Sequence, residues 1–212
     1  MAIKRSELSA LVKQIQTEAP GFELREKRDS KLMWFFYYAG FMRFWMPGFM
    51  ETVWVTLGKI VYVPYLDTFG KDLQGDYATL WHERDHILLL QQWEKKLSKP
   101  VAAVAWTVGY GSPQILALGA VGAIWGSLWW LLCLGLLAPW PAPVRTYIEL
   151  RGYTATIEAW RKMGAPLPYP PDSWLASMVN ETFCGWKYYR MSWRPKAIEA
   201  HFVRQMDQMK AN

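Results

Sequence analysis

The sequence predicts a mainly helical α+β protein that folds as a single domain over residues 1–212. Helical spacing of apolar residues recurs along the chain, whereas the stretch Thr52–Val63 is rich in β-branched and aromatic residues and has a break at Gly58-Lys59. A third observation is an apolar run, residues 101–144, whose 44 positions include no Asp, Glu, Lys or Arg. We therefore expect a small strand pair beside a helical core, with the apolar run inserted as a helical hairpin.

The composition excludes several classes of protein. Hydrophobic residues make up 52% of the chain and there are 14 Trp, the opposite of a polar, aromatic-poor disordered segment. The net charge is +6, but the basic residues are interspersed with acidic ones, so we expect no nucleic-acid partner, and the apolar content favours lipid. Cys133 and Cys184 form no CxxC, which excludes a thiolate zinc site. The basic N-terminus lacks a following apolar stretch, so we expect no cleaved secretory signal and a reducing compartment.

Start and stop signals predict where the helices lie. Expected helices span residues 5–18, from Asp76 as N-cap to Ser98, from Pro141 to Met163-Gly164, and from Ala197 onward. The stretch Leu32–Met50 is dense in aromatic residues but interrupted by Arg43 and Pro47. It is either an interfacial segment or an aromatic core helix.

The helix that begins near Asp76 carries the chemistry. His82 and His86 are four residues apart, so both imidazoles can face one cation from the same side of the helix. Glu83 is offset around the helix and can hold a metal-bound water without ligating the metal. This HExxH arrangement predicts a zinc site with Glu83 as the general base. The longer motif with a third histidine is excluded, because its positions are Leu89 and Gln92.

A zinc site needs a third protein ligand, and the helix after Pro141 supplies one. Glu149 is our expected ligand, in preference to Glu158, which lies deeper in its helix among basic and aromatic neighbours. Gly152 allows close helix approach, and Tyr153 lies one turn after Glu149. Tyr153 either donates a hydrogen bond to the developing oxyanion or packs against the site helix. His201 is either a second candidate for that donor or a surface histidine.

Two other interpretations compete with the zinc site. Arg84 and Asp85 place two charges inside the motif, which is typical of a solvated helix face with a chance pair of histidines. A di-iron oxidase is the other, because Glu83 and His86 also form an ExxH. That class requires a second such motif, and Glu199-Ala200-His201 has the wrong spacing.

With these motifs the chain resembles gluzincin-type zinc peptidases, in particular small bacterial and phage-encoded proteins. Residues 50–160 carry the resemblance, through Ile60–Pro64, His82–His86 and Glu149–Tyr153. It implies a minimal zincin-like core in which the region Thr52–Val63 binds the extended backbone of a peptide substrate. The chain differs from better-known members by having Tyr153 where an acidic residue often supports the first histidine.

The expected zinc site constrains the apolar run. If His86 and Glu149 bind one ion, both ends of residues 101–144 lie on the same side of any membrane, which excludes a single crossing. Forty-four residues suffice for two spans of about twenty, and basic residues flank both ends. We expect transmembrane helices with lipid contacts and the zinc site on the cytoplasmic side. The alternatives are a re-entrant loop and a hairpin buried in a protein core or oligomer interface.

The sequence thus predicts a zinc-dependent metallopeptidase that hydrolyses a peptide or protein substrate. Its expected zinc ligands are His82, His86 and Glu149, and its expected catalytic residues are Glu83 and Tyr153. The alternative is an inactive zincin-fold structural protein of a membrane or of a phage virion.

Overall fold

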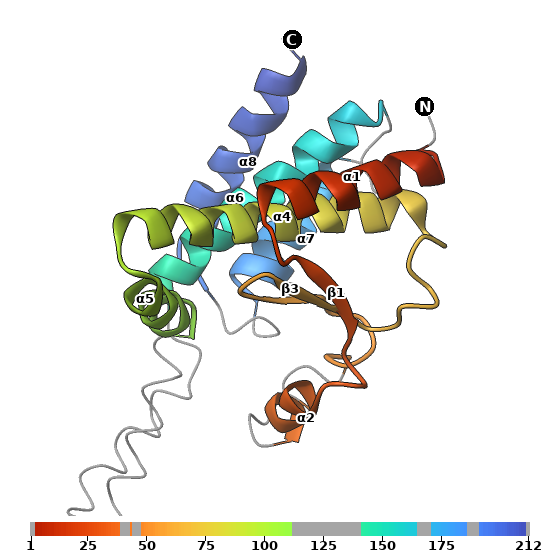
Figure 1. The fold of residues 1–212 in the computed structure, drawn as a ribbon. Coiled ribbons are helices and arrows are strands. Elements are labelled where there is room, and N and C mark those ends of the chain that lie inside the picture. Colours follow the sequence, from red (N-terminus) through yellow and green to blue (C-terminus); the bar gives the residue numbers. More distant parts are fainter. Residues whose placement is uncertain are drawn as a thin grey trace, which may run out of the picture. The chain divides into compact units, whose positions relative to one another are not determined.

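The structure is a computed structural model that describes residues 3–38, 43, 48–111, 141–164, 171–185 and 191–210. The described residues are mainly helical and include a three-stranded sheet, as the predicted α+β class requires (Figure 1). The chain divides into two compact units, Met1–Gln92 with Arg151–Pro166, and Trp93–Leu150 with Leu167–Asn212. The borders at Gln92–Trp93 and Leu150–Arg151 fall inside continuous helices.

The sheet of the first unit has the strand order β1-β3-β2. β2 (Val55–Leu57) and β3 (Ile60–Val63) form the antiparallel pair predicted for Thr52–Val63, turning at Gly58 with a φ of 63°. β1 (Glu23–Glu26) pairs with β3 in parallel, with Glu23 opposite Ile60. The prediction missed β1, because Glu-Leu-Arg-Glu contains none of the β-branched or aromatic residues that indicate a strand.

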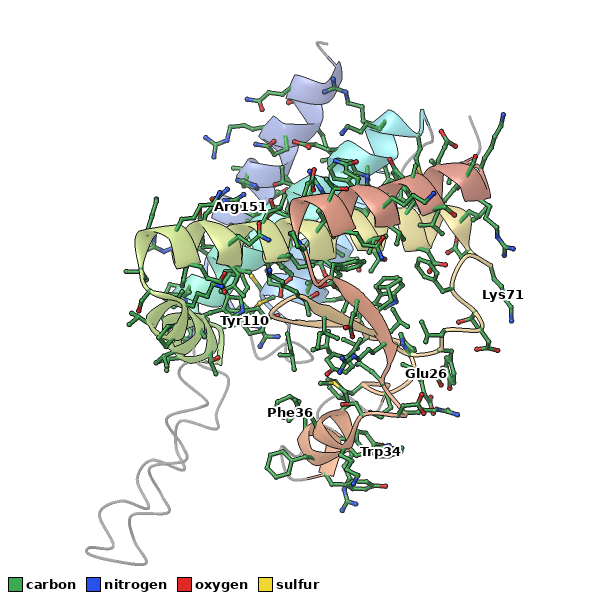
Figure 2. All side chains as sticks on the ribbon, in the orientation of Figure 1. Glu26, Trp34, Phe36, Lys71, Tyr110 and Arg151 are labelled. Atoms are coloured by element: carbon green, nitrogen blue, oxygen red, sulfur yellow. The ribbon has the colours of Figure 1, made fainter. Side chains whose placement is uncertain are left out.

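Helices enclose this sheet. α1 (Arg5–Glu18) confirms the predicted first helix and buries Leu8, Leu11 and Ile15. In Figure 1 α1 and α4 lie above the sheet and α2 (Lys31–Tyr38) below it. The aromatic stretch is therefore helical over its first part, with Met33 in a core cluster against which Phe36 packs; Figure 2 labels Phe36 and Trp34 on α2.

The site helix begins earlier than its sequence indicates. α4 spans Leu73–Lys96, so the predicted N-cap, Asp76, lies inside its first turn, and that prediction is wrong. The Asp76 carboxylate instead accepts a hydrogen bond from the backbone N–H of Gly70 at 2.6 Å. Burial raises the pKa of Asp76, and the Gly70 hydrogen bond opposes that shift. The early start leaves the HExxH motif near the middle of a 24-residue helix, where fraying is least.

The second unit contains the remaining helices. They are α5 (Lys99–Gly111), the first turns of α6 (Pro143–Lys162), α7 (Pro171–Ser177), the π-helix η3 (Met178–Phe183) and α8 (Pro195–Lys210). Gly164, with a φ of 59°, follows α6 and confirms its predicted end. The core of this unit is aromatic, with the Phe202 ring 5.5 Å from that of Trp174 and 5.7 Å from that of Phe183.

The structure corrects the prediction of transmembrane helices. Within the described ranges no helix is long and apolar enough to cross a bilayer. Residues 101–111, where the predicted hairpin begins, belong to α5. Most of the predicted hairpin, residues 112–140, lies outside the described residues, as do Cys133 and the predicted loop from Pro166.

Candidate metal centre

α4 presents the two histidines and the glutamate of the motif from its buried side. His82, Glu83 and His86 are 9%, 6% and 6% exposed. The two imidazole rings lie edge to face, with centroids 4.5 Å apart and planes at 84°. Because residues four apart in a helix share one face, this contact follows directly from their spacing. The motif is therefore not a solvated helix face.

The two charges inside the motif attach α4 to its neighbours. The Arg84 guanidinium donates to the Glu18 carboxylate of α1 at 2.6 Å and 2.8 Å. This hydrogen bonding is the main reason that the pKa of Glu18 is lowered. Asp85 accepts from Arg151 of α6 at 3.0 Å and 3.2 Å, and Arg151 is labelled beside α4 in Figure 2. Both charges thus have structural roles within the first unit.

Gly152 lets α6 lie directly against His82. A Cβ atom built on Gly152 would meet three atoms of the His82 ring at 2.6–2.9 Å, closer than real Cβ contacts come. Two residues of the same helix complete the contact. The Tyr153 ring lies edge-on to His82 with centroids 4.7 Å apart, and the Thr156 hydroxyl is 3.4 Å from Nδ1.

A residue of the sheet fixes the side chain of Glu83. The Thr56 hydroxyl of β2 donates to Glu83 Oε2 at 2.6 Å, so one carboxylate oxygen has a fixed partner. Lys27, which follows β1, is fully buried, with Nζ 2.5 Å from the Phe49 carbonyl and 3.7 Å from the centre of its ring. Burial lowers the pKa of Lys27 to about 7, and the negative charge of Glu83 opposes this shift.

Glu149 completes a cluster of three potential ligands. It lies on α6, one turn before Tyr153, and is 8% exposed. One nitrogen of His82, one of His86 and one carboxylate oxygen of Glu149 all lie within 4.8 Å of one another. Tyr110 of α5, labelled in Figure 2, donates a hydrogen bond from its hydroxyl to Glu149 Oε1. Two imidazoles and one carboxylate are a donor set that zinc accepts in catalytic sites.

The other candidates are not members of this cluster. Glu158 is exposed on α6 and is not in the cluster. His201 lies on α8 with its ring against Phe202, and burial, followed by the charge of Arg204, lowers its pKa. Among the described residues, the cluster of potential ligands includes neither of them.

Four contacts of the site were not predicted from the sequence. Thr156 stands one helical turn after Gly152, so the spacing that indicated Glu149 and Tyr153 could also have indicated it. Thr56, Lys27 and Tyr110 carry no comparable signal, because their contacts depend on how separate elements pack.

Comparisons of the chain with protein-family models, with curated proteins and with solved structures give no match.

Proposed function

We propose that the chain is a zinc-dependent metallopeptidase with a zincin-like core, in which His82, His86 and Glu149 bind the metal. The observation that carries this proposal is the grouping of one atom from each side chain within 4.8 Å. Ligand atoms around a tetrahedral zinc lie about 3.4 Å apart when each bond is about 2.0–2.1 Å. Small side-chain rotations are enough to reach that spacing from the observed one.

The neighbouring side chains support a hydrolytic site. Bound zinc would supply Lewis acidity and bring the pKa of a water towards neutrality. Glu83 lies next to the first ligand and takes a proton from the attacking water, while Thr56 fixes one of its oxygens. Thr156 donates to the Gly152 carbonyl at 3.2 Å, so its oxygen accepts from His82 Nδ1 and leaves Nε2 for the metal. Tyr153 is the candidate donor to the oxyanion.

The sheet supports a peptide as the substrate. β2 is an edge strand of the described sheet, and its middle residue, Thr56, contacts Glu83. An edge strand presents backbone N–H and C=O groups with which an extended peptide can pair. A peptide bound along β2 would pass beside the carboxylate that activates the water.

One feature favours the alternative, an inactive structural protein with the same cluster. Glu83 is only 6% exposed and one of its oxygens already accepts from Thr56, which also suits a purely structural carboxylate. The two functions differ in whether Glu83 is needed for hydrolysis.

The test begins with the metal content of the purified full-length chain. We expect one zinc per chain, lost in Glu149→Ala and kept in Glu158→Ala, an exposed carboxylate on the same helix. Glu83→Gln should keep the zinc and abolish cleavage of a peptide library. Absence of zinc from the wild type overturns the proposal. Zinc without hydrolysis that depends on Glu83 favours the structural alternative.

A further inference from the structure

Tyr110 donates a hydrogen bond from its hydroxyl directly to an expected metal ligand. It lies at the end of α5, half-buried, and its hydrogen bond goes to Glu149 Oε1. The guanidinium of Arg145, one turn before Glu149 on α6, lies 5.0 Å from the centre of the Tyr110 ring. The ring and the hydroxyl of Tyr110 therefore both contact side chains of α6.

The packing of α5 on α6 explains why the hydroxyl reaches Glu149. A Cβ atom built on Gly109, the residue before Tyr110, would lie 2.7 Å from Val144 Cγ1. Only glycine permits so close an approach between the two helices. This contact and the hydrogen bond lie within the second unit and involve neither histidine of the motif.

The geometry points to Tyr110 as a positioning residue that makes Glu149 a ligand through one oxygen, Oε2. Its hydroxyl occupies Oε1 and fixes the rotation of the carboxylate. One-oxygen binding keeps the protein ligands at three and leaves the fourth position of a tetrahedral site open for water. The inference rests on the proposed metal centre and adds a residue outside both motif helices.

The test compares zinc affinities, measured by competition with a chromogenic chelator. Tyr110→Phe removes the hydroxyl and keeps the ring, and we expect a loss of about 10- to 100-fold, the usual effect of removing a hydrogen-bond partner of a ligand. The matched control is Tyr147→Phe, because Tyr147 is 50% exposed and lies two residues before Glu149. It should bind zinc like the wild type.

Repeating the measurement in a Glu149→Gln chain separates a positioning effect on Glu149 from a general disturbance of the fold. Because the hydroxyl acts through the carboxylate, Tyr110→Phe should cause no further loss in a Glu149→Gln chain. An equal loss in both backgrounds, or an unchanged affinity of the single variant, overturns the role of Tyr110. If the wild type binds no zinc, the metal centre itself is wrong, and the two failures are thereby distinguished.

Discussion

The contact between Gly152 and His82 yields the sharpest test of the site. In Gly152→Ala the new methyl group would lie 2.6 Å from His82 Cε1, against 3.4 Å for an ordinary contact, so the ring must retreat by about 0.8 Å. Alanine favours the helix by about 1 kcal/mol, whereas crowding a packed contact costs about 1–3 kcal/mol. The metal-free protein should therefore lose at most about 2 kcal/mol of stability.

The effect on metal binding should be larger than the effect on folding. A shift of 0.8 Å exceeds the roughly 0.2 Å tolerance of a metal–ligand distance, so we expect zinc affinity to fall by about tenfold or more. Urea unfolding of the metal-free chain and chelator competition measure the two effects separately. Gly75→Ala is the control, because the three atoms nearest to that methyl group would all belong to the flexible Asp72 side chain. Unchanged zinc affinity in Gly152→Ala would refute the placement of α6 against His82.

Three further predictions concern the surroundings of the site. Because the pKa of Lys27 is about 7 when folded and 10.5 in the reference state, the unfolded chain binds more protons between these values. The free energy of unfolding should therefore rise with pH across that range, by up to about 1.4 kcal/mol per unit, and Lys27→Met should flatten the rise in urea titrations; equal slopes would contradict the assignment. A double-mutant cycle of Asp85→Asn and Arg151→Met should give a coupling of about 1 kcal/mol, and additivity would show that the pair does not hold α6. Thr56→Val should lower the free energy of unfolding in urea by about 1–3 kcal/mol because it removes the hydroxyl that donates to the buried Glu83, and Thr56→Ser should largely keep the wild-type value; a valine variant as stable as the wild type would contradict that hydrogen bond.

Much of the cluster could be predicted because it is encoded by the helical period. His82 and His86 share a face of α4 through their spacing, and Glu149 and Tyr153 share a face of α6 for the same reason. Glu149 could be selected as the third potential ligand because Gly152, three residues later, permits close helix packing. That zinc fills the cluster stays a prediction.

Features that depend on packing between distant segments were not predictable. β1 is recognised only by its pairing with β3, because its own residues carry no strand signal. The start of α4 was placed too late, because Asp76 has the residue type of an N-cap but uses its carboxylate for Gly70. Tyr110 reaches Glu149 only through the approach of α5 to α6, which local spacing cannot reveal.

The residues of α6 at the candidate centre form a spaced sequence motif. Glu149, Gly152, Tyr153 and Thr156 follow the spacing of a single helical stripe, Glu-x-x-Gly-Tyr-x-x-Thr. A deletion of one residue between Glu149 and Gly152 would rotate everything beyond it by about 100° and move Glu149 off the face that contacts His82. Chains too divergent to align could therefore be recognised by this motif downstream of an HExxH. The motif would distinguish them from sequences in which an HExxH occurs by chance.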